Sequence, residues 1–320
     1  MPTETAVQYS LLSKKENAHE DPIYCCAWTK IKPTGDSLEK SQDYIVSGGL
    51  DGNVKVWRVA YNKLELLYNL QGHSMAIVSI AISPDGHTLA TTSLDSVLII
   101  WELSSGFKVH EIETSATDTW NVAFSPDGSK IVTGSHTGKL IMYDVEKKNV
   151  VKSLDTRGSF ALCVAWSKDS KYIASGSVDG SICIFDVVQG KLIHTIDGHT
   201  ETIRSIEFSH NNQLLLTASN DGFAKLFKVA SGDLQCSLKL EKWLLSAKFS
   251  LDGTRVALGT SDGEVIIATV SDLKVLHTFQ EHTSMVCGVQ FNAESEMVVS
   301  VAKDRTINIY GCPKLTTNKK

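Results

Sequence analysis

The stretch Ile82-Ser-Pro-Asp-Gly86 decides the fold, because it returns along the chain at a nearly constant interval. It recurs as Phe124-Ser-Pro-Asp-Gly128 and Phe249-Ser-Leu-Asp-Gly253, and in weaker form at 166–170, 208–212 and 291–295. The residues after the apolar position are numbers 83, 125, 167, 209, 250 and 292, so the spacings are 42, 42, 42, 41 and 42. A second marker keeps the same interval at Trp57, Trp101, Tyr143, Phe185, Phe227, Ala268 and Tyr310. The chain therefore contains seven repeats.

Each repeat contains four short segments that alternate with turn residues. In the second repeat these segments are 78–83, 88–93, 97–102 and 107–111, rich in Val, Ile and Thr and separated by Asp-Gly, Asp-Ser or Ser-Gly. Such segments predict antiparallel strands joined by tight turns. A four-stranded repeat of this length, with a histidine early and an aromatic residue late, is typical of the blade of a WD-repeat β-propeller. The predicted fold class is all-β, a seven-bladed propeller.

The two ends of the chain predict how the ring closes. The last repeat ends after three strands, at 306–310, whereas the apolar segment 7–14 precedes the first repeat and belongs to no blade. If this N-terminal segment supplies the fourth strand of the last blade, no sheet edge is left at the junction. We expect one domain over residues 1–312 and a polar tail over 313–320.

Composition argues against several classes of function. The chain of 320 residues has 31 Lys and Arg against 36 Asp and Glu, a net charge of −5, so a basic surface for direct binding of nucleic acid is not expected. No apolar run is long enough to span a membrane, and no secretory signal is visible. The seven cysteines form no C-x-x-C pair, which predicts buried thiols in a reducing compartment, with no metal and no cofactor. We expect a nuclear and cytoplasmic protein.

Four blades carry a set of polar residues at repeated offsets. A histidine, a hydroxyl residue, an aspartate and often a tryptophan can hydrogen-bond in series, and ten extra residues separate the first two members in the first blade. Although a buried Asp, His and Ser resemble a hydrolase triad, their recurrence predicts structural networks, because buried polar groups must satisfy one another. We expect no catalytic residue. The predicted networks are His19, Ser47, Asp51 and Trp57; His73, Thr91, Asp95 and Trp101; His199, Thr217 and Asp221; and His282, Ser300 and Asp304.

If the four strands of a blade are lettered a to d in chain order, the d–a and b–c connections lie on one face of the ring, here called the top face. Offsets from the histidine position predict which side chains surround the channel on this face. These side chains are largely apolar, and exposed apolar patches usually mark binding sites for partners. Asp118 and Arg204 would add polar anchors, and a carboxylate beside aromatic rings suits an arginine-bearing peptide. The alternative is that some side chains, mainly Val78, Leu162 and Leu245, fill the channel. The predicted partner-binding residues are Tyr24, Leu50, Leu94, Asp118, Trp120, Phe160, Leu162, Val178, Arg204, Trp243, Leu245 and Met285.

Three further stretches resemble a known family. Ala18-His-Glu-Asp-Pro-Ile-Tyr24, Ser153-Leu-Asp-Thr-Arg-Gly-Ser159 and Ile307-Asn-Ile-Tyr-Gly-Cys-Pro313 are similar to the small WD-repeat subunit shared by the superkiller (Ski) complex and, in animals, the RNA polymerase II-associated factor (Paf) complex. The longer insert at 31–43 and the lysine-rich tail depart from this family.

The resemblance implies a non-catalytic scaffold. Its partners would be the tetratricopeptide scaffold and the RNA helicase of the Ski complex, which feeds mRNA to the cytoplasmic exosome in the 3′-to-5′ direction, and the Paf subunits in transcription elongation. The family binds the tetratricopeptide partner through its top face, partly by an arginine-containing motif. RNA would be bound by the helicase.

Two other classes of function remain as alternatives. One is the substrate receptor of a cullin-type ubiquitin ligase, which often carries Trp-Asp-x-Arg at the end of the third strand. The corresponding stretch here is Trp57-Arg-Val-Ala60 in the first repeat, and the next three repeats also lack the arginine. The other is an enzyme with its active site at the channel mouth, which would need converging ionisable groups that the predicted top face does not offer.

Overall fold

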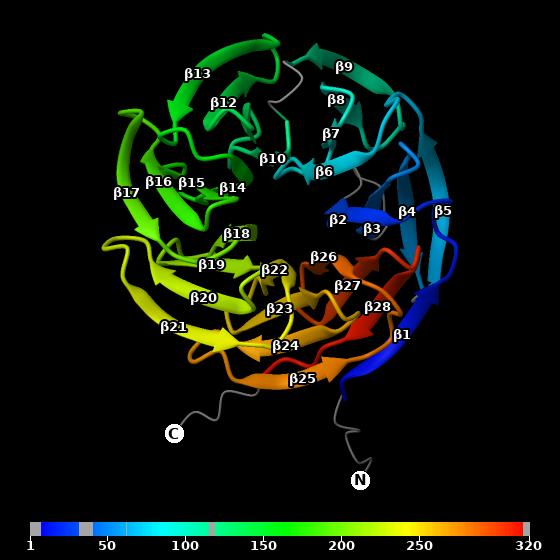
Figure 1. Cartoon of the computed structure of the whole chain (residues 1–320). Helices are drawn as coiled ribbons and strands as arrows, with labels where there is room; N and C mark the ends of the chain where they lie inside the picture. Colours follow the sequence, from blue (N-terminus) through cyan, green and yellow to red (C-terminus); the bar gives the residue numbers. More distant parts are fainter. Residues whose placement is uncertain (1–7, 32–40, 62, 115–118, 316–320) are drawn as a thin grey trace.

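Seven four-stranded antiparallel sheets form a ring around a central channel (Figure 1). The computed structural model describes residues 8–31, 41–61, 63–114 and 119–315. Every regular element within these ranges is a strand. In each blade the first strand lies nearest the channel and the last lies at the outer edge (Figure 1). The β-propeller predicted from the repeats is therefore confirmed.

Six blades follow the chain directly, from the inner strand to the outer strand. Blade 1 contains β2 (Ile23–Ile31), β3 (Gln42–Gly49), β4 (Val54–Ala60) and β5 (Lys63–Leu70). Blade 2 contains β6 (Ile77–Ile82), β7 (Thr88–Ser93), β8 (Val97–Glu102) and β9 (Lys108–Glu113). Blade 3 contains β10 (Asn121–Phe124), β11 (Lys130–Gly134), β12 (Lys139–Asp144) and β13 (Asn149–Asp155).

The remaining blades complete the ring. Blade 4 contains β14 (Ala161–Trp166), β15 (Tyr172–Ser177), β16 (Ser181–Asp186) and β17 (Lys191–Asp197). Blade 5 contains β18 (Ile203–Phe208), β19 (Leu214–Ser219), β20 (Phe223–Lys228) and β21 (Leu234–Lys239). Blade 6 contains β22 (Leu244–Phe249), β23 (Arg255–Thr260), β24 (Val265–Thr269) and β25 (Val275–Phe279). Blade 7 contains β26 (Val286–Phe291), β27 (Met297–Ala302), β28 (Ile307–Gly311) and β1 (Ser10–Lys15).

The N-terminal strand closes the ring. β1 pairs antiparallel with β28, with Leu11 opposite Tyr310. This confirms the predicted closure and covers an edge that would otherwise be open to pairing with other chains. The predicted domain limits at 312 and 313 stay a prediction, and residues 1–7 and 316–320 lie outside the described residues.

The predicted strand bounds hold best where tight turns mark both ends. In blade 2, the predicted segments 88–93 and 97–102 coincide with β7 and β8, whereas β6 begins one residue before the prediction and β9 extends two residues beyond it. The predicted insert lies between β2 and β3, as expected, but residues 32–40 lie outside the described residues.

The hydrophobic core is divided among the blade interfaces. One cluster joins Val46 and Val56 of blade 1 to Ile77, Leu89 and Trp101 of blade 2. A similar cluster joins blades 7 and 1, and another joins blades 5 and 6. Because each blade buries one apolar face against each neighbour, the stability of the sheets depends on the closed ring.

Polar side chains on the inner strands also connect neighbouring blades. Asn121 in blade 3 donates from Nδ2 to Ser79 Oγ in blade 2 at 3.1 Å, and its Oδ1 accepts the Val164 N–H of blade 4 at 3.1 Å. Ser246 Oγ in blade 6 accepts the Val289 N–H of blade 7 at 3.2 Å. These bonds hold the inner strands in register around the channel.

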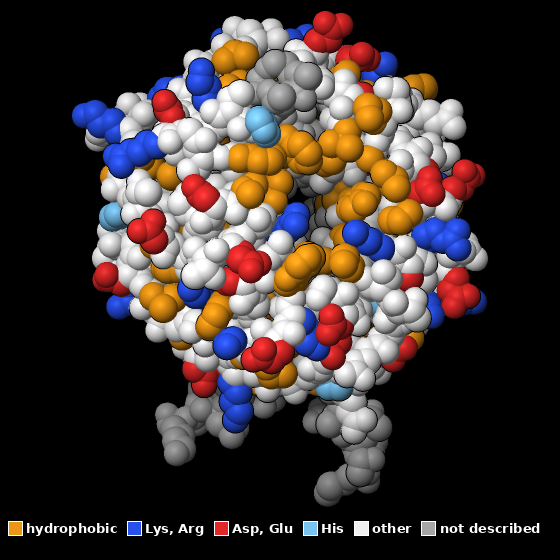
Figure 2. Space-filling view, in the orientation of Figure 1, with side chains coloured by type: hydrophobic (Ala, Val, Ile, Leu, Met, Phe, Trp, Pro, Cys, Tyr) orange, Lys and Arg blue, Asp and Glu red, His pale blue; other side chains and the backbone are white. Residues whose placement is uncertain are grey.

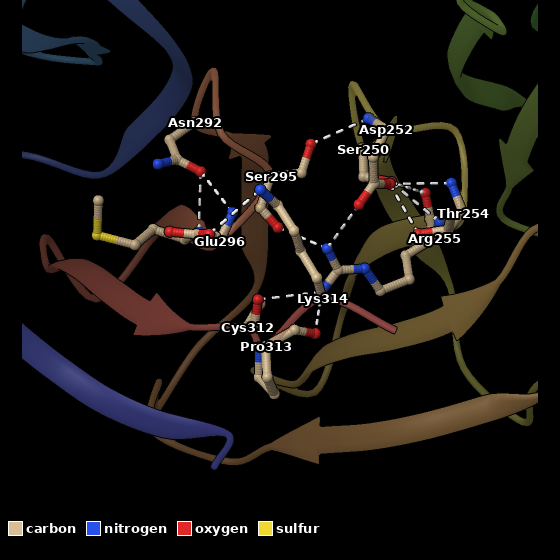
Figure 3. A network of polar contacts seen from close by, with 11 residues as sticks. Ser250, Asp252, Thr254, Arg255, Asn292, Ser295, Glu296, Cys312, Pro313 and Lys314 are labelled. Carbon is tan, nitrogen blue, oxygen red and sulfur yellow. Dashed lines mark hydrogen bonds and ion pairs between the residues drawn. The ribbon is translucent and has the colours of Figure 1, made fainter. Parts of the chain in front are cut away.

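A buried arginine fixes the end of the chain to blades 6 and 7 (Figure 3). The side chain of Arg255 is fully buried, and its Nη1 donates to the carbonyl oxygens of Cys312 at 3.0 Å and Pro313 at 2.6 Å. Its Nη2 donates to Ser295 O at 2.5 Å and to Asp252 Oδ2 at 3.1 Å. The guanidinium thus joins three segments that are distant in sequence, and we call this set of contacts the Arg255 clasp.

Candidate partner-binding site

The polar network of blade 1 has the predicted connections. His19 Nδ1 lies 3.0 Å from Asp51 Oδ2, and its Nε2 lies 2.8 Å from Ser47 Oγ. Trp57 Nε1 donates to the same hydroxyl at 2.9 Å. Burial alone would raise the pKa of Asp51, but the hydrogen bond and charge of His19, with two backbone N–H donors, lower it to about 2. The hydroxyl is fully buried and is engaged by both His19 and Trp57, so it is not accessible to a substrate.

The other networks repeat this arrangement with local differences. In blade 2, His73 contacts Asp95 and Thr91, and Trp101 donates to Thr91 Oγ1 at 2.9 Å. In blade 5, His199 lies 2.9 Å from Asp221 Oδ2 and 2.8 Å from Thr217 Oγ1. Phe227 stands where the tryptophan would be, and it has no donor. This network is therefore limited to three members, as the sequence predicts.

Blade 7 contains two members that the offsets missed. His282 contacts Asp304 and Ser300, and Ser300 Oγ lies 3.3 Å from Tyr310 Oη. Thr306 Oγ1 lies 2.7 Å from His282 Nδ1, and Asn308 Nδ2 donates to Tyr310 Oη at 3.0 Å. Thr306 directly precedes the third strand, β28, and Asn308 lies on it, at positions that no offset from the histidine marked.

Blades 3, 4 and 6 replace the network by other contacts. Ser135 and Thr137 hydroxyls lie 2.6 Å apart in blade 3, where Thr137 occupies the aspartate position. In blade 4, Asp179 accepts hydrogen bonds from Ser177 and Ser159. The hydroxyl position of blade 6 is the fully buried Leu258, packed in the cluster between blades 5 and 6. Ser115, at the histidine position of blade 3, lies outside the described residues.

A β-bulge at the top of the inner strand positions the candidate site. In blade 1 the register with β3 shifts between Ile23 and Cys25, so Tyr24 has no partner on β3. The same shift occurs in blades 2, 4, 5, 6 and 7. A bulge re-aims the side chain of its extra residue, and every one of these residues lines the channel. The bulged residues are Tyr24, Val78, Leu162, Arg204, Leu245 and Cys287.

Hydrophobic side chains gather around the channel mouth on the face shown in Figure 2, whereas charged side chains are scattered over the outer rim. The channel encloses about 960 Å³. Several predicted residues are substantially exposed: Leu50 by 44%, Leu94 by 40% and Trp243 by 46%. The members of the predicted set that line the channel are Tyr24, Leu50, Leu94, Trp120, Leu162, Arg204, Trp243, Leu245 and Met285, here called the mouth ring.

Three predicted residues are not among the channel-lining side chains. Phe160 packs edge-on against the Trp120 ring at 5.3 Å, so it adjoins the mouth ring. Val178 is 41% exposed, and its N–H donates to Phe160 O, which places it beside Phe160. Asp118 lies outside the described residues, and the carboxylate predicted to accompany the aromatic rings is therefore not placed. None of the other predicted residues is fully buried.

The charged groups beside the mouth ring are mainly cations. Lys303 Nζ lies 5.7 Å from the centre of the Tyr24 ring, a cation–π contact between blades 7 and 1. Arg204 Nε donates to Asn220 Oδ1 at 3.0 Å. The offset rule places Lys303 on the top face, at the turn position of blade 7, although the predicted partner-binding set omits it. The rule missed Met75, which is 50% exposed beside the buried Ala76. Met75 falls one position outside the offset rule, so the sequence carries no signal for it.

The prediction of seven buried thiols needs a correction. Only Cys163, Cys183 and Cys312 are buried, whereas the other four are half-buried because inner-strand and outer-strand positions leave part of each side chain open. Burial raises the pKa of Cys287 to about 11, against the opposing effect of Lys303 and Arg204, so this thiol stays protonated at neutral pH. Among the described residues, no group of His, Cys, Asp or Glu has the arrangement of a metal site. The same part of the chain contains no helix long and apolar enough to cross a membrane.

Comparisons with known proteins agree with this geometry. A family model described as the IFT122 first beta-propeller matches residues 37–311, and the WD domain, G-beta repeat model matches residues 11–58. The chain belongs to the WD-repeat propellers of this IFT122 first-propeller family. A propeller of this family is a fold suited to a scaffold or adaptor role, and such folds are generally non-catalytic.

Three relatives each match part of the chain. It is 32% identical to the WD repeat-containing protein SL1-17 of Schistosoma mansoni over 114 residues, which is 36% of each chain. It is 28% identical to the WD repeat-containing protein VIP3 of Arabidopsis thaliana over 111 residues, which is 35% of this chain and 32% of that protein. The match to the small ribosomal subunit protein RACK1y of rice is 35% over 72 residues, or 22% and 21% of the two chains. The matched segment thus spans about a third or less of each relative's length.

Proposed function

We propose that this WD-repeat propeller is a non-catalytic scaffold that binds partner proteins through the mouth ring. The observation that carries the proposal is the ring itself, because exposed Trp and Leu side chains around a channel are characteristic of binding sites for partners. The buried hydroxyls of the polar networks support a structural role for those residues.

The resemblance to the shared Ski and Paf subunit suggests which partners occupy the ring. We propose the tetratricopeptide scaffold and the RNA helicase of the Ski complex, in cytoplasmic 3′-to-5′ mRNA decay, and the subunits of the Paf complex in transcription elongation. This assignment places the protein in both the nucleus and the cytoplasm. It requires no nucleic acid, membrane or metal contact by the propeller itself.

The test is affinity purification of the full chain beside the double variant Trp120→Ala/Trp243→Ala, with bound proteins identified by mass spectrometry. A double variant of comparable exposed residues on the outer surface, Phe107→Ala/Val188→Ala, is the matched control, since these side chains are 73% and 85% exposed. We expect the mouth-ring variant to lose partner recovery by about tenfold or more, because a central aromatic anchor contributes about 2 kcal/mol or more to binding.

A measurement of the melting temperature separates loss of binding from loss of fold, because Trp120 also packs on Phe160. Unchanged recovery of every partner by a folded mouth-ring variant would contradict the proposed binding surface. Recovery of a cullin adaptor in place of Ski and Paf subunits would favour the ligase-receptor alternative.

A further inference from the structure

The channel is lined by more cations than carboxylates, although the chain as a whole carries a net charge of −5. Among the described residues that line it, the carboxylate is Glu207, whereas the cations are Lys30, Lys168, Arg204, Lys248 and Lys303. Glu207 lies 3.5 Å from Lys248, and Lys30 pairs with Glu294. No carboxylate of the described residues lies within ion-pair distance of the other three cations. The channel therefore holds positive charge that this part of the chain does not neutralise.

Two of these unpaired cations belong to the mouth ring or contact it. Arg204 is the bulged residue of blade 5, between the bulged residues Leu162 of blade 4 and Leu245 of blade 6. The side chain of Lys303 lies over Tyr24, and its backbone N–H donates to the carbonyl oxygen of Met285. Cys287, the bulged residue of blade 7, lines the same channel as both cations, and both oppose the rise in the pKa of its thiol. Figure 2 shows basic side chains within and beside the hydrophobic ring.

Apolar side chains and cations without a carboxylate partner lie together at the channel mouth, and this combination indicates which kind of peptide can bind there. A bulky apolar side chain can cover Trp243, Leu245 or Tyr24, but an accompanying arginine or lysine would meet Arg204 and Lys303 and be repelled. A carboxylate in the same position would form charge-assisted hydrogen bonds with the guanidinium and ammonium groups in a partly desolvated setting. The mouth therefore selects an acidic residue that is flanked by apolar ones.

We propose that the mouth ring binds a linear segment of a partner protein in which an Asp or Glu inserts between Arg204 and Lys303 while neighbouring apolar side chains pack on Trp243 and Tyr24. This inference rests on the proposed scaffold function and names the chemistry of the partner. An arginine on the same segment, as the family resemblance implies, has to contact a different part of the rim. Single-stranded or duplex nucleic acid fits less well, because its phosphates need an extended basic stripe.

The test measures fluorescence anisotropy of short labelled peptides added to the full chain. One peptide carries a central Glu flanked by Leu and Trp; in two matched peptides the Glu is replaced by Gln or by Arg. We expect the Glu peptide to bind about tenfold more tightly than the Gln peptide, with the difference shrinking as salt is added. The Arg peptide is expected to bind more weakly than both.

Variants of the protein locate the effect. Arg204→Gln and Lys303→Gln should each weaken binding of the Glu peptide about fivefold or more and leave binding of the Gln peptide nearly unchanged. Arg58→Gln is the control, because Arg58 is an exposed residue of the third strand of blade 1 that pairs with Glu65. Equal or tighter binding of the Arg peptide, no effect of Arg204→Gln, or displacement of the Glu peptide by an RNA oligonucleotide would each overturn the inference.

This outcome is distinguishable from failure of the proposed function. If Trp120→Ala/Trp243→Ala abolishes recovery of partners while Arg204→Gln and Lys303→Gln do not change it, the scaffold function stands and the acidic anchor is wrong. If neither set of variants changes recovery, the scaffold surface itself is wrong.

Discussion

Replacing Arg255 by methionine tests whether the Arg255 clasp holds the end of the chain against blades 6 and 7. Methionine keeps a long flexible side chain that can pack on Phe291, whose ring centre lies 5.7 Å from the guanidinium carbon. It has no donors, so the carbonyls of Ser295, Cys312 and Pro313 and the carboxylate of Asp252 each lose a hydrogen bond. Figure 3 shows these acceptors converging on one guanidinium.

The expected cost follows from the burial of the acceptors. Ser295 and Cys312 are buried, at 1% and 0% exposure, and each buried acceptor left without a donor costs about 1–3 kcal/mol. Asp252 and Pro313 can turn to water, and removing a buried cation returns some free energy. We expect the free energy of unfolding to fall by about 3–5 kcal/mol, as when one partner of a buried ion pair is removed. With an unfolding entropy of about 2.1 cal/mol/K per residue, the melting temperature should fall by about 4–8 °C.

The assay compares thermal unfolding of the wild type, Arg255→Met, Arg255→Lys and Arg58→Met. Lysine should lose an intermediate amount, because its single ammonium cannot reach all the acceptors of a planar guanidinium. Arg58→Met should cost less than about 1 kcal/mol, since its pair with Glu65 lies at the surface. Hydrogen exchange in β28 should accelerate in Arg255→Met alone. If Arg255→Met melts no lower than Arg58→Met, the clasp does not stabilise the ring.

Three other changes test the network, the blade junction and the closing strand. Burial lowers the pKa of His73 and His199 below 6.5, although the neighbouring Asp95 and Asp221 act to raise it, so unfolded chains take up protons that folded chains do not. The free energy of unfolding should therefore be highest above pH 6.5 and decrease as the pH falls through the lowered pKa values of the folded state. A urea midpoint that rises on acidification would refute this. Gly180→Ala would place a Cβ 2.1 Å from His199 O, whereas Gly253 has a similar positive φ but open space where a Cβ would lie. Gly180→Ala should therefore destabilise the fold by at least about 2 kcal/mol more than Gly253→Ala. Equal melting temperatures of the two variants would refute the clash. Deleting residues 1–15 removes the β1 strand Ser10–Lys15 and exposes the edge of β28; light scattering should detect association of the shortened chain, and a stable monomer would show that β28 needs no cover.

The mouth ring illustrates how far sequence offsets reach. The offset rule found Tyr24, Leu162 and Arg204 because the repeats keep the same number of residues between the histidine position and the inner strand. It did not reveal that each of these is the extra residue of a bulge, which is what points its side chain into the mouth. In blade 2 the rule's position three residues after His73 is Ala76, which is only 5% exposed, and the rule missed the exposed neighbour Met75. Local spacing therefore located the site to within a residue or two.

The sequence does not predict the contacts between blades 7 and 1, where the ring closes. Lys303 and Tyr24 lie 279 positions apart and meet because blade 7 packs beside blade 1. No spacing within a repeat predicts this pair. It places the ammonium group of Lys303 over Tyr24 and so adds positive charge to the channel mouth. The acidic residue that the sequence placed beside the rings, Asp118, lies outside the described residues, so the charged groups of the described mouth are those of other blades.

The sequence by itself determined the number of blades, their order and the closing strand, because the repeat length and the turn residues are local properties that recur in each repeat. It also determined the His–hydroxyl–Asp networks, since their members recur at constant offsets. Only the tertiary structure decided the Arg255 clasp, because three of its four acceptors are backbone carbonyls that any residue could supply. It likewise decided the electrostatics of the mouth, because charges from separate blades meet there only once the ring has closed.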